Sequence, residues 1–439
     1  MKKVLMLPWL AHGHISPFLE LARMLSLRGF SVFLCSTPVN LSSVRRSVPE
    51  EGSSSSVKLV EINLPVLPNL PPLYHTTRGL PPRLMNTLKS AFDASGPALA
   101  EIIKCVSPDL LVYDFLLPWA PLVAGSCGIP AVLFAPVGAG MASFVMHMFA
   151  GGGKEYPFDI HVDDYFLSQV NDHLSEEAEN GISVEDRVTQ CFARSSKVVL
   201  LKTFRDFEGK YIDYLSQLTG KKVVPVGPLV PGPSQEDEHD LIQWLDEKEN
   251  SSTIFVSFGT EYFLSEKERE EIAYGLELSN VNFIWVLRFP AGEEIAIEDA
   301  LPIGFLERVK NRGIVVDTWA PQAIILAHPS IGGFVSHCGW SSVMESMKFG
   351  VPVVAIPMHL DQPLNARVIE GARIGVEIKR GKGGKLERDE IARQVRCVVF
   401  EEDGASVRQK AKEVRNGIAS RGDADIDEVA NELIRVSGV

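Results

Sequence analysis

Residues 319–362 read WAPQAIILAHPSIGGFVSHCGWSSVMESMKFGVPVVAIPMHLDQ, and the pattern of this stretch decides the fold. Residues 334–336 have the apolar composition of a strand end, residues 337–340 are typical of a turn, and Ser341 opens a helix. Residues 353–356 predict a second, buried strand. The stretch is therefore a strand–turn–helix–strand unit, which is typical of a parallel α/β sheet.

The start of the helix in this unit predicts an anion-binding site. Free backbone N–H groups and a positive dipole lie there, and side chains that add donors cluster beside them: His337, Ser341 and Ser342. Ligands of open parallel sheets bind beyond the carboxyl ends of the strands, where Asp361 and Gln362 follow. We therefore expect an anionic group, a flat ring at Trp319 and a polyhydroxyl group at Asp361 and Gln362 to share one crevice.

The same stretch resembles, over its full length, the signature box of plant UDP-dependent glycosyltransferases of family 1. It keeps the opening WAPQ, the central HCGW, the helical Glu345 and the closing DQ. The resemblance implies contacts for each part of UDP-glucose: Trp319 and the Ala320 backbone for uracil, Gln322 and Glu345 for ribose, His337 and Ser342 for pyrophosphate, and Trp340, Asp361 and Gln362 for the sugar. It also places Ser257 and Thr260, which follow a predicted strand, beside the pyrophosphate.

One position departs from the usual box. Ser341 stands where most family members carry Asn, and its shorter side chain reaches less far towards the phosphates. This variant resembles the plant subgroup that adds a sugar to a sugar already attached to an acceptor. The resemblance therefore implies a glycoside acceptor with an apolar terpenoid or phenolic part, and glycosylation of a free aglycone hydroxyl is the alternative.

A second constellation, His14 and Asp114, suits proton transfer. An inverting sugar transfer needs a base for the acceptor hydroxyl, and a carboxylate can orient a histidine ring and stabilise its charged form. His14 follows the first predicted strand and Asp114 ends a later one, so a doubly wound sheet places both at one edge. The family's catalytic pair matches these two residues. His12 is the rival base, but the Gly-His-x-x-Pro spacing favours His14.

The order of predicted elements favours an α/β fold with two similar halves. The chain starts as βαβ, with a helix from Pro17 capped by Ser16, and a second strand–helix series begins at residue 253. The resemblance implies the GT-B fold, in which two Rossmann-like domains face each other across a cleft. We expect an N-terminal acceptor domain over residues 1–230, a linker over 231–245, a donor domain over 246–420 and a helix over 421–439 that packs back on the first domain. Residues 154–190 are polar and predicted to be irregular.

The first half offers candidate acceptor-binding residues. Apolar side chains at helical spacing form one predicted wall: Met141, Phe144, Met148 and Phe149. Methionine-rich surfaces adapt to irregular apolar ligands, although a core role explains the same spacing. The loop at residues 74–78 offers His75 and Thr76 as polar anchors.

Composition excludes several classes of protein. The 43 basic and 56 acidic residues give a net charge of −13, which disfavours nucleic acid and anionic membranes as partners. Six scattered cysteines without a CxxC pair indicate reduced, buried thiols of a cytoplasmic protein. Pro8 interrupts the apolar run that mimics a signal peptide, and four prolines divide the uncharged residues 115–153. We expect no membrane insertion and a monomer.

Two other patterns point elsewhere and are weaker. Residues 138–143 imitate a dinucleotide fingerprint without its third glycine, which leaves a nicotinamide-dependent oxidoreductase as a remote alternative. Asp423, Asp425 and Asp427 match the Asp-x-Asp metal motif of other glycosyltransferases, but they open the last helix and suit its dipole. We expect no metal and no cofactor, with His337 and the helix N-terminus neutralising the phosphates. A UDP-sugar-binding protein without catalysis is the last alternative.

Overall fold

The chain divides into two compact units. The computed structural model describes residues 1–45, 57–150, 155–160, 164–232, 240–290, 295–381 and 383–438. The first unit comprises Met1–Pro157, Asp163–Leu229 and Arg421–Val439, and the second comprises Phe158–Val162 and Val230–Ser420. Of the predicted linker, residues 233–239 lie outside the described residues, and helix α10 (Asp240–Asp246) already begins inside it. The linker prediction was therefore too long, because Leu241 and Leu245 are buried and belong to the second core.

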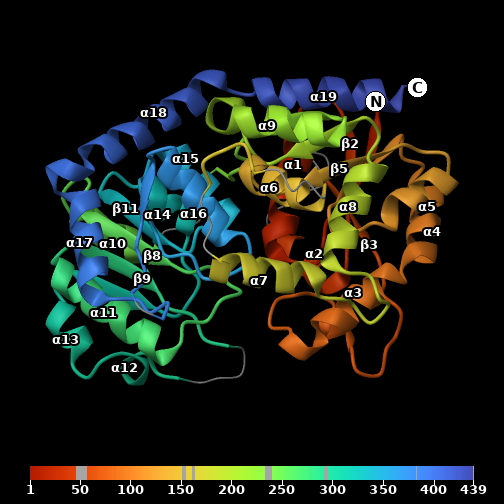
Figure 1. The fold of residues 1–439 in the computed structure, drawn as a ribbon. Coiled ribbons are helices and arrows are strands. Elements are labelled where there is room, and N and C mark those ends of the chain that lie inside the picture. The colour runs from red at the N-terminus through yellow and green to blue at the C-terminus, as the bar shows by residue number, and fades with distance from the viewer. Residues whose placement is uncertain are drawn as a thin grey trace. The chain divides into compact units, whose positions relative to one another are not determined.

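The first unit is built on a seven-stranded parallel sheet in the order β3-β2-β1-β4-β5-β6-β7 (Figure 1). Its strands are β1 (Lys3–Leu7), β2 (Ser31–Ser36), β3 (Lys58–Glu61), β4 (Leu110–Asp114), β5 (Ala131–Ala135), β6 (Val198–Leu201) and β7 (Lys222–Pro225). Its helices are α1 (His12–Ser26), α2 (Pro38–Val44), α3 (Met85–Asp93), α4 (Gly96–Val106), α5 (Ala120–Ser126), α6 (Ala139–Phe149), α7 (Asp164–Ser175), α8 (Val184–Arg194), α9 (Arg205–Thr219) and α19 (Ala424–Ser437). Short 3-10 turns span Pro72–Tyr74 and Pro82–Leu84.

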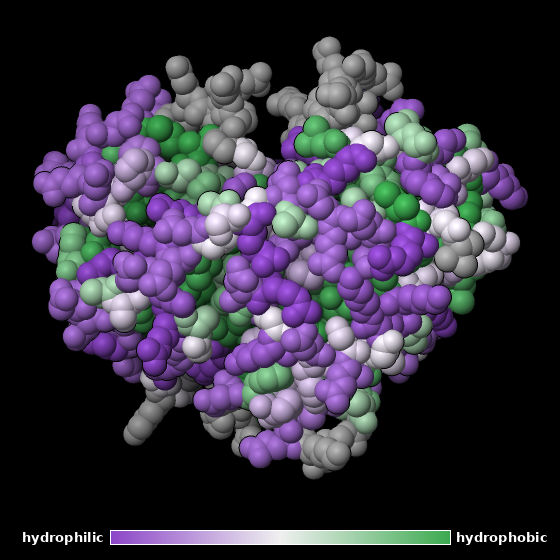
Figure 2. All heavy atoms as spheres, turned by 90° about the horizontal axis from the view of Figure 1, so that it is seen from above, coloured by the Kyte–Doolittle hydropathy of each residue, from purple (hydrophilic) through white to green (hydrophobic). Residues whose placement is uncertain are grey.

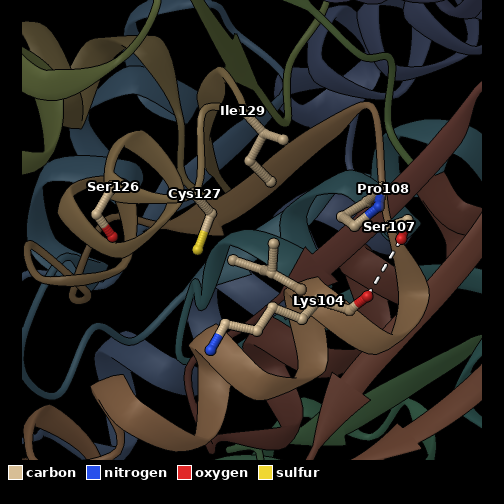
Figure 3. A pocket seen from close by; sticks show the side chains of 7 residues that line it. Lys104, Ser107, Pro108, Ser126, Cys127 and Ile129 are labelled. Carbon is tan, nitrogen blue, oxygen red and sulfur yellow. Dashed lines mark hydrogen bonds between the residues drawn. The ribbon is translucent and has the colours of Figure 1, made fainter.

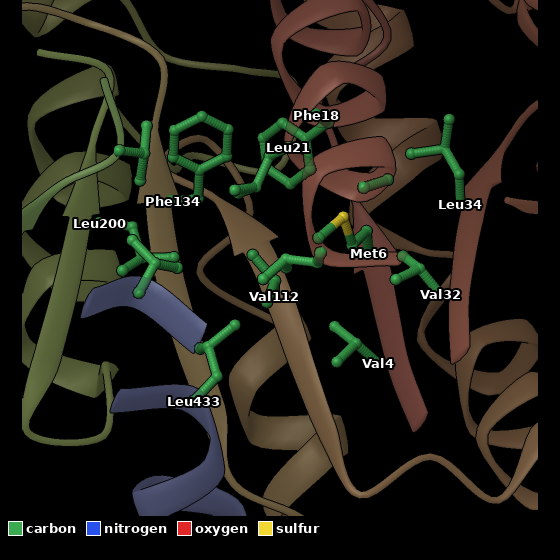
Figure 4. Packing of buried hydrophobic residues seen from close by; sticks show 14 of the residues in the cluster. Val4, Met6, Phe18, Leu21, Val32, Leu34, Val112, Phe134, Leu200 and Leu433 are labelled. Atoms are coloured by element: carbon green, nitrogen blue, oxygen red, sulfur yellow. The ribbon is translucent and has the colours of Figure 1, made fainter. Parts of the chain in front are cut away.

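The core of the first unit explains why the last helix belongs to it. Val4 pairs with Val32 on one side and with Leu110 on the other, so these strands present matching apolar rows. Figure 4 shows these rows with Phe18 of α1 above the sheet and Leu433 of α19 against it. Leu433 is fully buried in this cluster. Burial of one apolar face of α19 is thus what ties the C-terminal residues to the N-terminal half.

The second unit repeats the architecture with six parallel strands in the order β10-β9-β8-β11-β12-β13. The strands are β8 (Thr253–Ser257), β9 (Asn282–Val286), β10 (Gly313–Val316), β11 (Ile331–Ser336), β12 (Val353–Ala355) and β13 (Gly375–Glu377). The helices are α10, α11 (Glu266–Ser279), α12 (Ile297–Ala300), α13 (Phe305–Val309), α14 (Gln322–Ala327), α15 (Trp340–Phe349), α16 (Gln362–Gly371), α17 (Arg388–Val399) and α18 (Ala405–Arg421). A 3-10 turn spans Glu402–Gly404.

Successive residues of the central strands enter two different cores, which places helices on both faces of the second sheet. Phe283 and Trp285 of β9 pack in the cluster that contains α11 and α17, whereas Ile284 packs in the cluster that contains α10 and α14. Strands buried on both faces read as continuous apolar runs, which is why they are recognisable in the sequence. Two parallel sheets of this kind confirm the predicted Rossmann-like halves.

Two local predictions were wrong. Helix α1 begins at His12 rather than at Pro17, because the N–H groups of His14 and Ile15 donate to the Ala11 carbonyl and close a turn before the proline. His14 therefore lies in the first turn of a helix, not in a loop. Residues 154–190, predicted to be irregular, include α7 and most of α8. Ser183 caps α8 by accepting from the Asp186 N–H.

A buried ion pair fixes α8 in place. Both terminal nitrogens of Arg187 donate to the Asp93 carboxylate, at 2.8 and 2.5 Å, and the Arg187 side chain is 1% exposed. Arg187→Met would remove the guanidinium from the buried Asp93 carboxylate and leave it the neutral amide of Asn180, whose Nδ2 donates to Asp93 Oδ2 at 2.7 Å. We expect this variant to lose ~3–5 kcal/mol of the free energy of unfolding, measured by chemical denaturation.

The exposed pair Arg205–Asp213, also joined at 2.8 Å, supplies the control. Arg205→Met should cost under ~1 kcal/mol, because water screens this pair. Equal losses of unfolding free energy in both variants would contradict a special stabilising role for the buried Arg187–Asp93 pair.

Candidate active site

His14 and Asp114 meet at the carboxyl edge of the first sheet. His14 Nδ1 lies 2.8 Å from Asp114 Oδ2, and Asp114 is fully buried at the end of β4. A carboxylate only accepts, so Nδ1 carries the proton and the lone pair lies on Nε2. Nε2 is the atom with which such a histidine acts as a base. The sequence prediction that these two residues come together is confirmed.

The backbone around Asp114 holds its carboxylate in one orientation. The Leu116 N–H donates to Asp114 Oδ1 at 3.2 Å, and the Phe115 ring stacks on His14 with 5.3 Å between centroids. Behind the strand, the Tyr113 hydroxyl donates to the Cys191 carbonyl on α8 at 2.7 Å. The stacking of Phe115 on His14 and the hydrogen bond from Tyr113 to the Cys191 carbonyl cannot be read from the sequence, and only the fold reveals them.

In the second unit, the loop between β11 and α15 wraps the ring of His337. Cβ atoms placed on Gly259 or Gly339 would lie 2.8 and 2.6 Å from His337 Nε2, closer than atoms approach without a clash. Gly259 also has φ +77°, and Cys338 has φ +66°. Two glycines therefore make the space that His337 occupies.

The surroundings of His337 favour the neutral form of its ring. Desolvation lowers its pKa to about 4, and the nearby His359 acts in the same direction. The expectation that His337 neutralises phosphate charge stays a prediction, because a bound pyrophosphate would itself favour the charged imidazolium. At neutral pH its imidazole can still donate one hydrogen bond, and the positive end of the α15 dipole remains for an anion.

The structure brings together the residues expected at a ribose. Gln322 Nε2, at the start of α14, donates to Glu345 Oε2 at 2.6 Å and to Ser342 Oγ at 3.2 Å, both on α15. Trp319 precedes this group and is 62% exposed, so one ring face is available for stacking. Ala320 is buried beside it.

The remaining predicted donor residues differ in exposure. Trp340, which begins α15 one residue earlier than expected, and Ser257 at the end of β8 are both buried. Thr260 is exposed and Ser341 is half-buried. The contact of Trp340 with the donor sugar and those of Ser257, Thr260 and Ser341 with the phosphates stay predictions.

Asp361 and Gln362 follow β12 and sit in different hydrogen-bond networks. Asp361 Oδ2 accepts from Asn365 Nδ2 at 2.7 Å. Gln362 is buried, and its Oε1 accepts from the backbone N–H groups of Met358 and His359 at 3.0 and 3.1 Å. Its Nε2 therefore faces His359 Nδ1, at 2.9 Å. Gln362 orders the loop before α16, and the second N–H of its Nε2 is the group that it can offer to a sugar.

The candidate acceptor residues lie in the first unit. His75 and Thr76 are buried, and their polar side-chain atoms face the Leu70 and Leu10 carbonyls at 3.2 and 3.5 Å. Phe144 is buried against Tyr156, with 5.1 Å between ring centroids. Met141, Met148 and Phe149 are half-buried on α6. These polar atoms stabilise the loop at residues 70–76, so acceptor contact by His75 and Thr76 stays a prediction.

The discounted motifs have structural explanations. The N–H groups of Ala139 and Gly140, where a dinucleotide phosphate would bind, both donate at 2.7 Å to the buried carboxylate of Glu208. Asp425 pairs with Arg421 at 2.5 Å. The other two aspartates of that motif pair with Arg28. The structure as described contains no cluster of three His, Cys, Asp or Glu arranged for a metal.

Hydropathy, a surface pocket and the exposure of the cysteines complete the description of the chain outside the predicted site. No helix in the described ranges has the length and hydropathy to cross a membrane, and the face drawn in Figure 2 is largely hydrophilic. A pocket between the end of α4 and the turn after α5, bordered by Lys104 and Cys127, contains none of the predicted site residues (Figure 3). Cys127 and Cys397 are half-buried and Cys105 is exposed, so the expectation of six buried thiols was wrong for these three.

The cradle around His337 generates a prediction. Gly259→Ala forces a side chain into a left-handed backbone position and against His337 Nε2, so the loop must shift. We expect UDP affinity, measured by calorimetry, to fall at least about tenfold, or ~1.4 kcal/mol. A Cβ on Gly371 of α16 would meet nothing within 4 Å. Gly371→Ala should therefore bind UDP normally, and normal binding by Gly259→Ala would show that His337 does not contact UDP.

Two family models and two sequence relatives match this chain. Residues 2–231 match the family model "Glycosyltransferase, N-terminal domain", and residues 194–398 match "UDP-glucoronosyl and UDP-glucosyl transferase". The chain is 49% identical to UDP-glucosyltransferase 29 of Panax ginseng, over 99% of this chain and 96% of that protein. It is 46% identical to a beta-D-glucosyl crocetin beta-1,6-glucosyltransferase of Gardenia jasminoides, over 98% of both chains.

A solved structure supports the fold. The complex between 3,4-dichloroaniline and a UDP-glucosyltransferase from Polygonum tinctorium capable of glucosylating indoxyl has a TM-score of 0.82 and 26% identity, covering 100% of this chain and 99% of that one. The two Rossmann-like units thus have the GT-B architecture. Sequence relatives across the whole length, the box at residues 319–362 and the fold together show that the chain belongs to the plant family 1 UDP-glycosyltransferases.

Proposed function

We propose that this enzyme transfers glucose from UDP-glucose to a sugar hydroxyl of a small-molecule glycoside, with His14 as the general base and Asp114 as its partner. The observation that carries the catalytic part is the 2.8 Å contact between His14 Nδ1 and the fully buried Asp114 carboxylate. A neutral histidine oriented in this way accepts a proton at Nε2 and is stabilised as a cation by the carboxylate.

The transfer is a single displacement. The acceptor hydroxyl oxygen forms a bond to the anomeric carbon while the bond from that carbon to the UDP phosphate oxygen breaks. The hydroxyl proton goes to His14 Nε2, and the bonding electron pair leaves with UDP. Attack opposite the leaving group inverts the α-linked donor to a β-linked product. No metal takes part in this scheme, and no step requires a cofactor.

The second unit supplies stabilisation for the leaving group. Negative charge grows on the UDP phosphate as the bond breaks, and preorganised donors lower the energy of that state. The N–H groups at the start of α15 and the imidazole of His337 are such donors. Ser342 lies in the first turn of α15, and Ser257 ends β8. Gln322 and Glu345 then hold the ribose, and Trp319 stacks on uracil.

Two observations support a glycoside acceptor. Ser341 replaces the usual Asn of the box, as in the subgroup that extends sugar chains. The Gardenia relative carries an already glucosylated acceptor in its name, at 46% identity. The half-buried Met141 and Met148 of α6 supply an adaptable apolar wall for the aglycone.

Glucose as the donor sugar and the cytoplasm as the compartment belong to the same proposal. Both relatives described above are glucosyltransferases by name, and Gln362 is the family's usual partner of glucose. All six cysteines are free, which suits a reducing compartment. A donor panel with UDP-glucose, UDP-rhamnose and UDP-glucuronate, read by mass spectrometry, tests the sugar.

Removal of the base separates chemistry from binding. His14→Ala should lower kcat by roughly 10²–10⁴-fold, the usual contribution of a general base, because the acceptor proton loses its destination. UDP affinity should remain unchanged, since the uracil and phosphate residues lie in the other unit. His12→Ala is the matched control two residues away and should keep nearly normal turnover.

Two other outcomes of these turnover measurements would contradict the proposed role of His14. Near-normal turnover of His14→Ala with a defective His12→Ala would transfer the role to His12. Wild-type protein that binds UDP but transfers no sugar to any acceptor would favour the non-catalytic interpretation.

Matched acceptor pairs test the substrate class. A site that pairs the hydroxyls of a sugar rejects an analogue without them, because its polar groups remain unsatisfied. We expect kcat/KM for a terpenoid or phenolic glucoside to exceed that for its free aglycone by at least about tenfold. Equal or better use of the aglycones would remove the glycoside assignment and leave the UDP-glycosyltransferase family membership intact.

A further inference from the structure

Asn365 is a buried polar side chain of the second unit, and packing alone does not explain why an amide rather than an apolar group stands there. It lies on α16 and is completely buried. Its Nδ2 donates to the Cys338 carbonyl at 3.0 Å and to Asp361 Oδ2 at 2.7 Å. Its Oδ1 is buried and has no hydrogen-bond partner. Because both partners of Nδ2 are acceptors, the orientation of the amide is fixed, and a buried oxygen is left unsatisfied.

The two acceptors belong to different parts of the expected donor site. Cys338 follows His337 directly and has φ +66°, a backbone conformation that a non-glycine residue adopts only when its surroundings hold it. Asp361 follows β12 and is the residue expected at the donor sugar. A single NH₂ group thus joins the loop that presents His337 to the carboxylate that faces the sugar.

The chemistry of the amide suits this task. Its two N–H groups bind one neutral carbonyl and one carboxylate, and the second bond is charge-assisted and therefore the stronger. A basic side chain at this position would neutralise Asp361, whereas an amide fixes the carboxylate and leaves its charge in place. Asp361 then keeps acceptor strength for sugar hydroxyls.

We propose that Asn365 is a positioning residue of the donor site, which holds the His337–Cys338 loop and the Asp361 carboxylate in register so that pyrophosphate and sugar are bound together. This role rests on the proposed contacts of His337 and Asp361 with the donor. It adds a residue outside the 319–362 box to the machinery that selects UDP-sugars. The residue acts through its neighbours and needs no contact with substrate.

The test separates positioning from stability. Asn365→Leu keeps the branching at Cγ and removes both donors, and Asn365→Asp keeps the shape but opposes Asp361 with a second carboxylate. We expect KM for UDP-glucose to rise about 10–100-fold in either variant, the effect of losing a hydrogen bond to a charged group. KM for the acceptor should stay at the wild-type value. Calorimetry of the folded protein should show weaker UDP binding as well, by a smaller factor.

A purely structural asparagine would behave differently. Asn40 of the first unit is only 5% exposed. Its Nδ2 donates to Thr37 Oγ1 at 3.0 Å and to the His75 carbonyl at 3.3 Å. Asn40→Leu should lower the melting temperature and leave UDP affinity unchanged. If the Asn365 variants also lose only melting temperature, with normal KM and UDP affinity in the folded fraction, Asn365 is structural and the proposal is overturned.

A double substitution distinguishes failure of this proposal from failure of the donor-site assignment. Asp361→Ala alone should raise KM for UDP-glucose and leave UDP affinity nearly intact; if KM is unchanged, the sugar contact itself is refuted. In the Asp361→Ala background, Asn365→Leu should leave the ratio of UDP-glucose KM to UDP dissociation constant unchanged within about twofold. A further rise in this ratio would show that Asn365 does not act through Asp361.

Discussion

Both sheets are covered by helices on their two faces, and this constraint decides where chemistry can occur. Strand residues such as Val112 and Phe334 are fully buried, so polar side chains of the strands are confined to the ends. Parallel strands all end at one edge, which is why Asp114 after β4 and His14 after β1 meet in the first unit. The same rule collects the residues that follow β8, β11 and β12 in the second unit. Each unit thus gathers one group of the proposed site residues at the carboxyl edge of its sheet.

Much of this arrangement could be predicted from the sequence. Continuous apolar runs marked the central strands, and the 44-residue box assigned most donor contacts through its resemblance to a known family. The pairing of His14 with Asp114, 100 residues apart, followed from strand ends sharing an edge. The strands and the His14–Asp114 contact are confirmed because they depend on local composition and on the fixed geometry of parallel sheets, whereas the donor contacts stay predictions.

Other features depend on contacts that a motif does not encode. The lowered pKa of His337 arises from desolvation and from His359, 22 residues further along the chain. Helix α8 was missed although its apolar residues recur at helical spacing, because the surrounding segment is polar and one arginine, Arg187, is buried by pairing with Asp93. Asn365 was missed because it lies beyond the box, although its spacing of four residues from Asp361 predicts proximity on a helix.

The proposed activity of this enzyme is extension of the sugar of an existing glycoside. A monoglucoside that also carries a free aglycone hydroxyl offers both kinds of acceptor in one molecule. The most direct measurement is NMR of the product formed from this compound and UDP-glucose. The account predicts a new β-linked glucose attached to the first sugar. Glucose attached to the aglycone hydroxyl would contradict it.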